Sequence, residues 1–101
     1  MALDFRPVGI HFDVTSGIIQ RETGTAVFGG PVKRAIASLN GFNVFYANGD
    51  HPTRRQFVDL KVSEINNNTV TVEASLLLRD GSGNIDDPFG GDVDVVVLAE
   101  V

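Results

Sequence analysis

The chain has 101 residues, of which 43% are hydrophobic and 21% charged, and it contains no cysteine. These values are typical of a folded protein with a single core and argue against disorder, so we expect residues 1–101 to form one domain. Eight Lys and Arg residues against thirteen Asp and Glu residues give a net charge of −5. This balance disfavours nucleic acid as a partner, because polyanions bind basic surfaces. The lack of cysteine excludes disulfides and thiolate metal sites.

Signals for a membrane span or for secretion are missing from the sequence. No apolar run approaches the ~20 residues that cross a bilayer. The opening residues, MALDFRP, lack the basic segment and the apolar stretch of a secretory signal. We therefore expect no membrane span, and a location either in the cytoplasm or outside the cell by a route that needs no signal peptide.

Residues 8–14 alternate with a period of two. The apolar positions are Val8, Ile10, Phe12 and Val14, and the positions between them are Gly9, His11 and Asp13. This alternation predicts a β-strand with one face toward the core and the other toward water. His11 then lies at the surface, as we also expect for His51.

Residues 32–39 fit either a short helix or a strand. Helical spacing would place four apolar residues on one side, namely Val32, Ala35, Ile36 and Leu39. The turn signals at Gly29–Pro31 and Asn40–Gly41 leave barely two helical turns, however, and the neighbouring segments alternate as strands. We therefore favour a strand here. A further strand is predicted over 42–46, with Phe42, Val44 and Tyr46 on one face.

A polar loop is predicted after this strand, at residues 47–55. The sequence ANGDHPTRR gathers candidate binding groups at Asn48, Asp50, His51, Arg54 and Arg55. Hydrogen-bond acceptors and forked guanidinium donors beside an aromatic residue suit recognition of sugar hydroxyls or carboxylates. The alternative is a long hairpin loop in which Asp50 and the arginines only pair with one another.

Residues 55–79 predict an antiparallel hairpin. Its first strand turns Val58, Leu60 and Val62 inward, and its second turns in Val70, Val72, Ala74, Leu76 and Leu78. Asn66–Asn68 lie between the two strands, and asparagine tolerates the left-handed conformations of tight connections. The other face of the hairpin is polar and is expected to meet solvent.

The stretch RDGSGNIDDP, residues 79–88, places oxygen donors at alternating positions. These are Asp80, Ser82, Asn84 and Asp86, with Asp87 beside them. Such donors can converge on a hard cation such as Ca²⁺. The EF-hand pattern is not matched, because Ile85 replaces the glycine of the sharp turn and Gly91 replaces the bidentate glutamate. We therefore expect no cofactor, and keep a calcium site at Asp80, Asn84, Asp86 and Asp87 as the alternative to a solvated turn.

The last ten residues predict a strand with two apolar faces. The core face carries Val93, Val95, Val97, Ala99 and Val101. The other face carries Val96 and Leu98, and burial of such a side chain stabilises by about 1.5–3 kcal/mol. Together with Phe57 and Leu77, which also point outward, they predict an apolar patch that meets another subunit. The alternative is that the N-terminal segment covers this face.

Short alternating strands without a clear helix predict an all-β antiparallel β-sandwich. The sequence has no nucleophile elbow, phosphate loop or His-rich metal motif, so we expect a non-enzymatic protein. Two functions fit. One is an oligomeric carbohydrate-binding module, and the other is a structural building block that assembles without a small-molecule ligand.

From Phe28 to Val101 the order of features resembles the H-type lectin domain, the sugar-binding module of snail agglutinins and discoidins. FGGPV stands in the place of the Phe-x-x-Pro-Val entry of that family, and RRQFVDLKVSEI in the place of its R-x-x-V strand. TVTVEASLLL and VDVVVLAEV stand in the places of its last two strands.

The resemblance implies a sandwich of about six strands, a homotrimer, and sugar bound at the distal loops near subunit boundaries. Arg55 matches the arginine of the family's penultimate-hairpin strand. Arg79 and Asp80 match the positions where the family presents an aromatic and a polar residue. The chain has no tryptophan, so the aromatic platform for a sugar ring is missing at those positions.

Overall fold

The computed structural model describes residues 2–15, 19–46, 53–80 and 88–101. These residues form the strands β1 (Leu3–Thr15), β2 (Gln20–Val27), β3 (Arg34–Tyr46), β4 (Thr53–Asn66), β5 (Thr69–Asp80) and β6 (Phe89–Glu100). Within the described ranges there is no helix, and therefore none long and apolar enough to cross a membrane. The all-β prediction is confirmed, and residues 34–39 belong to a strand, as favoured.

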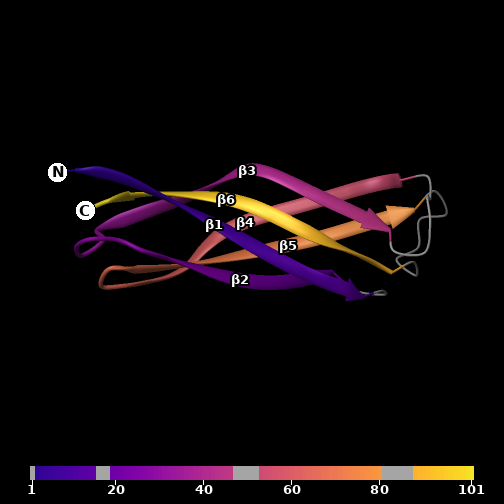
Figure 1. Cartoon of the computed structure of the whole chain (residues 1–101), viewed down its shortest axis with the longest axis horizontal. Helices are drawn as coiled ribbons and strands as arrows, with labels where there is room; N and C mark the ends of the chain where they lie inside the picture. The colour runs from indigo at the N-terminus through magenta and orange to yellow at the C-terminus, as the bar shows by residue number, and fades with distance from the viewer. Residues whose placement is uncertain (1, 16–18, 47–52, 81–87) are drawn as a thin grey trace.

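The strands form two three-stranded antiparallel sheets that pack as a sandwich (Figure 1). Sheet A has the order β1-β6-β3 and sheet B the order β2-β5-β4. The sandwich is long and narrow, measuring 50 × 18 × 17 Å. Both termini lie at one end, where Ala2 and Val101 exchange two backbone hydrogen bonds of 3.2 and 2.9 Å.

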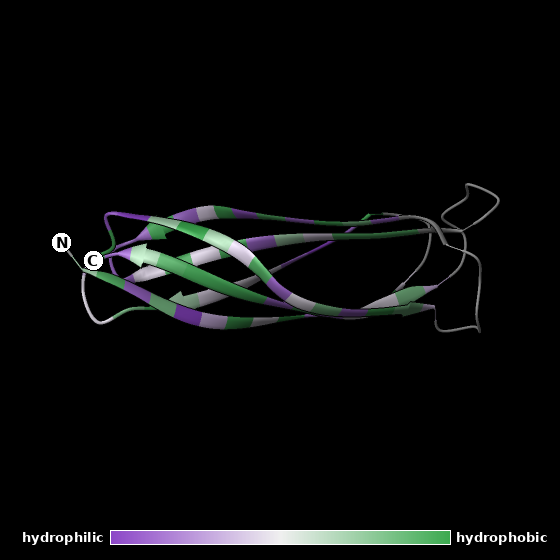
Figure 2. Ribbon diagram, turned by 90° about the horizontal axis from the view of Figure 1, so that it is seen from above, coloured by the Kyte–Doolittle hydropathy of each residue, from purple (hydrophilic) through white to green (hydrophobic). Residues whose placement is uncertain are grey.

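The core lies between the two sheets, and the central strands β5 and β6 supply most of it. Hydrophobic and polar residues alternate along the strands (Figure 2), and the inward set of β6, namely Val93, Val95, Val97 and Ala99, is at most 1% exposed. The inward set of β5, from Val70 to Leu78, is at most 5% exposed. The predicted β4–β5 hairpin is confirmed, and Asn67 in its turn has φ = 54°. The predicted inward faces are therefore correct for both central strands.

Polar side chains also connect the two sheets, as Arg6 and Gln20 show. At the end that holds the termini, Arg6 on β1 donates from Nε to the carbonyl oxygen of Val27 at 3.2 Å, and its guanidinium lies 5.2 Å from the centre of the Phe28 ring. Farther along, the buried Gln20 on β2 donates from Nε2 to the carbonyl oxygen of Phe89 on β6 at 2.7 Å. In each case the side chain donates to a backbone carbonyl of the opposite sheet. A buried carbonyl without a hydrogen-bond partner would lower the stability of the fold.

Strand irregularities explain where the simple alternation was wrong. We expected Val14 on the core face with Phe12, but Val14 is 46% exposed. The pairing of β1 with β6 shifts register between Phe12 and Thr15, so the alternation of sides is interrupted there. A second shift separates Leu39 from Gly41 in β3, at the Asn40–Gly41 signal that the sequence analysis identified.

Gly91 allows β6 to lie close to β3. Its φ of +149° falls in a region that other residues rarely adopt, and a Cβ atom there would lie 2.0 Å from the carbonyl oxygen of Asn43. Gly41, on the neighbouring strand, has no atom within 4 Å of the corresponding position. The close approach of the two strands therefore depends on the missing side chain of Gly91.

We expect Gly91→Ala to lower the free energy of unfolding by about 3 kcal/mol or more, because backbone strain and a backbone clash combine. Gly41→Ala is the matched control and should change it by less than about 1 kcal/mol. Urea denaturation followed by circular dichroism measures both. Equal unfolding midpoints for the two variants would contradict this account of Gly91.

Candidate functional site

The outer face of sheet A has an apolar half near the termini. Antiparallel pairing lines up residues of all three strands in rows across the sheet, and one row consists of Phe5, Leu98 and Ile36. The rows on either side add Leu3 and the pair Pro7 and Val96. Leu3, Phe5 and Ile36 are 64%, 63% and 61% exposed. We call this set the apolar patch: Leu3, Phe5, Pro7, Ile36, Val96 and Leu98.

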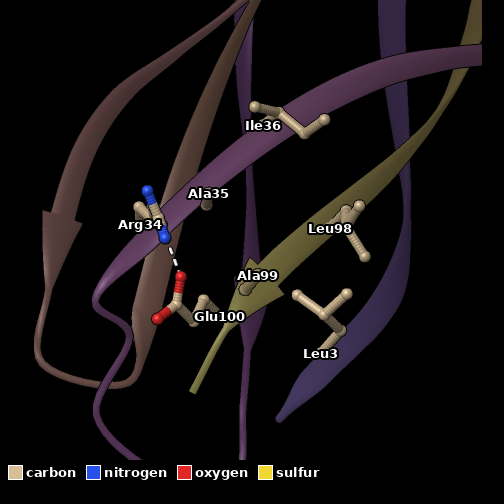
Figure 3. A pocket seen from close by; sticks show the side chains of 7 residues that line it. All are labelled: Leu3, Arg34, Ala35, Ile36, Leu98, Ala99 and Glu100. Carbon is tan, nitrogen blue, oxygen red and sulfur yellow. Dashed lines mark hydrogen bonds and ion pairs between the residues drawn. The ribbon is translucent and has the colours of Figure 1, made fainter. Parts of the chain in front are cut away.

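A shallow depression of about 180 Å³ lies on the apolar patch. Leu3, Ile36 and Leu98 surround it, and Figure 3 shows the side chains of Leu3 and Leu98 next to each other. Its polar border is an ion pair in which Arg34 Nε donates to Glu100 Oε2. The lining is otherwise aliphatic, so the depression suits an apolar side chain rather than a polar ligand.

The composition of this patch corrects the sequence analysis in two respects. Phe57 and Leu77 belong to sheet B, on the opposite side of the sandwich, and do not join Val96 and Leu98. The N-terminal segment does not cover the patch either, because β1 pairs beside β6 within the same sheet. It enlarges the patch by adding Leu3 and Phe5.

The other half of the same face is acidic. His11 Nδ1 lies 2.9 Å from Asp92 Oδ1, and His11 Nε2 lies 3.2 Å from Asp13 Oδ1. Only the protonated imidazole can donate to both carboxylates at once. The hydrogen bond to Asp92, together with the negative charges of Asp92 and Asp13, therefore raises the pKa of His11. No group of three or more residues suited to a metal ion occurs in the described ranges.

We expect the pKa of His11 in the folded protein to lie above its usual value of about 6.5. The ion pairs of His11 then favour the folded state below that value and lose their effect as the pH rises through the raised pKa. A titration of the His11 ring by proton NMR measures it. Asp92→Asn should lower the pKa toward its usual value, whereas the control Asp94→Asn should change it less. An unchanged pKa in Asp92→Asn would contradict the assignment.

The outer face of sheet B carries a mixed polar groove of about 190 Å³. Pairing places Arg21, Ser75 and Asp59 in one row across the three strands. The adjacent row on one side contains Lys61 and Glu73, whose Nζ and Oε1 atoms are 3.5 Å apart. We call this groove the sheet B groove; its lining is Ile19, Arg21, Phe57, Asp59, Lys61, Glu73 and Ser75.

Some of the candidate residues predicted from the sequence lie near one end of sheet B, and the others lie outside the residues that the structure describes. Asn48, Asp50, His51, Asn84, Asp86 and Asp87 lie outside the described residues. Arg54, Arg55, Arg79 and Asp80 belong to the strands, where β4 begins and β5 ends. Backbone pairing sets Arg55 opposite Arg79, and Thr53 opposite Asp80. The fold therefore brings the two arginine-bearing segments together.

The sheet B groove was not predicted from the sequence. The outward face of the hairpin, which carries Asp59, Lys61 and Glu73, was expected to be polar and to meet solvent, and it is. No sequence feature connected these residues with Arg21. The sequence feature that could have predicted the groove is the presence of both positive and negative residues at outward positions of three strands. That signal becomes specific only when the strand order is known.

Comparison of the chain with protein-family models, curated protein sequences and solved structures gives no match. The H-type lectin resemblance implied a sandwich of about six strands, and the structure is an antiparallel sandwich of six strands in two sheets.

Proposed function

We propose that this protein is an oligomeric, non-enzymatic carbohydrate-binding module whose subunits meet through the apolar patch. The observation that supports this proposal most is the contrast between the two outer faces of the sandwich. One has an apolar half with three large side chains more than 60% exposed, and the other has a polar groove. A module with one assembling face and one polar face can present the same binding surface on every subunit.

The apolar patch supports assembly on energetic grounds. Large side chains such as Phe5 and Ile36 each contribute about 1.5–3 kcal/mol when they leave water. Patches of this kind on small proteins are commonly contact sites. A second copy is a fitting occupant, because symmetric contact lets the aliphatic depression of each subunit receive an apolar side chain of its neighbour. The resemblance to H-type lectin domains favours a closed ring of three.

Carbohydrate recognition is supported by the resemblance and by the arginines at the end of sheet B. Arg55 and Arg79 stand opposite each other in the β4–β5 pairing, at backbone level. Forked guanidinium donors suit hydroxyl and carboxylate oxygens. The second candidate function, a building block without a small-molecule ligand, is favoured by the same apolar patch, since assembly alone would account for it.

We expect light scattering at micromolar concentration to give the mass of an oligomer, at least twice the 10.8 kDa of one chain. The double variant Phe5→Ser, Ile36→Ser should shift the mass toward one chain, because both side chains are mostly exposed in the single subunit and contribute little to its core. Val27→Ser on sheet B, where Val27 is 57% exposed, is the matched control and should keep the assembly. A single-chain mass for the unsubstituted protein would contradict assembly through this patch.

A glycan array probed with the assembled protein distinguishes the two candidate functions. We expect specific binding that weakens at least about tenfold in the dissociated Phe5→Ser, Ile36→Ser variant, because linked sites gain affinity by avidity. A blank array with an intact oligomer would contradict carbohydrate binding and favour the building block.

A further inference from the structure

The sheet B groove crosses all three strands of its sheet. Arg21 comes from β2, Glu73 and Ser75 from the central β5, and Phe57, Asp59 and Lys61 from β4. Its volume of about 190 Å³ is smaller than the ~300 Å³ at which pockets begin to enclose drug-sized molecules. The groove therefore has room for a single small ring with its substituents.

The charges of the groove balance. Arg21 and Lys61 carry two positive charges, and Asp59 and Glu73 carry two negative ones. A purely anionic or cationic ligand would meet like charges as well as opposite ones. A neutral polyhydroxyl ligand meets no such conflict, because each hydroxyl both donates to a carboxylate and accepts from a guanidinium or ammonium group.

The polar groups of the groove retain hydrogen-bonding capacity. The Lys61–Glu73 distance of 3.5 Å exceeds the roughly 2.7–2.9 Å of a well-formed charge-assisted hydrogen bond, so both groups can bond a third partner. Arg21 and Asp59 are exposed at the two edges of their row, with Ser75 between them. Together they form a border of donors and acceptors around the groove.

One end of the groove is apolar. Leu77 is only 3% exposed although it lies on the outer side of sheet B, and it belongs to the buried cluster against which Ile19 and Phe57 pack. Pairing sets Phe57 directly opposite Leu77. The ring of Phe57 is thus held beside the charged row. An aromatic surface next to hydroxyl partners matches a sugar ring, which has an apolar C–H face and a hydroxyl border.

We infer that the sheet B groove binds one residue of a neutral saccharide, with Phe57 against its apolar face and with Arg21, Asp59, Lys61 and Glu73 on its hydroxyls. This inference rests on the proposed function and assigns it a site. The groove lies on the sheet opposite the apolar patch, so assembly through sheet A leaves it accessible on every copy. The backbone of Arg55 and Arg79 lies two residues along β4 and β5 from Phe57 and Leu77.

The test uses an array of neutral glycans and their sialylated or sulfated counterparts, probed with the intact oligomer. We expect neutral glycans to bind, and binding to weaken at least about tenfold in Arg21→Gln and in Asp59→Asn. Both side chains are exposed, so neither substitution removes a core contact. Glu64→Gln, at an exposed position of β4 outside the groove, is the matched control and should bind normally. Light scattering verifies that all three variants keep the parent mass.

The other outcomes separate the site from the function. Specific glycan binding that survives both groove substitutions, and is lost in Arg55→Ala or Arg79→Ala, overturns the groove and leaves carbohydrate binding intact. Binding restricted to charged glycans overturns the neutral ligand. An array without binding overturns the proposed function, and the inference with it.

Discussion

Burial of one face of each central strand is the constraint on which the rest of the structure depends. β5 and β6 each have two paired neighbours, and their inward side chains are almost fully removed from water. The edge strands differ from one another. On β1, Ile10 and Phe12 are at most 3% exposed, whereas Phe42 on β3 faces the core side and is still 47% exposed. The central pair supplies most of the buried core cluster, and β1 is the edge strand that adds most to it, with Val8, Ile10 and Phe12.

A sandwich this narrow has little interior, so its outer faces make up much of its chemistry. Sheet A divides along its length into an apolar half and an acidic half that contains His11, Asp13 and Asp92. Sheet B instead mixes both signs of charge around Phe57. The two faces are thus suited to different contacts, one to a protein surface and the other to a polar ligand. This difference between the two faces supports the proposed multivalent module.

The close approach of the strands limits which residues can change. β6 comes so near β3 at Gly91 that a Cβ atom would overlap the backbone of Asn43, and β2 comes so near β1 at Gly24 that a Cβ atom would lie 2.6 Å from Val8 Cγ1. Gln20 adds a hydrogen bond between the sheets. These positions stabilise the frame, whereas the side chains of the apolar patch and of the sheet B groove project from it. Substitution of the exposed members of either surface therefore reports on binding or assembly more than on folding.

The sequence by itself determined most of the strands, though not β2 (Gln20–Val27), and the inward side of most of those it predicted, because the alternation of side chains is a local property of an extended chain. It identified the faces of β5 and β6 and the turn at Asn66–Asn68, and it failed at Val14, where a register shift interrupts the alternation. Only the tertiary structure decided which outward residues become neighbours. Strand order depends on pairing between distant segments. This pairing places Phe5 and Ile36 beside Leu98 on sheet A. It places Phe57 on sheet B, where Arg21 and Asp59 lie in one row on either side of Ser75.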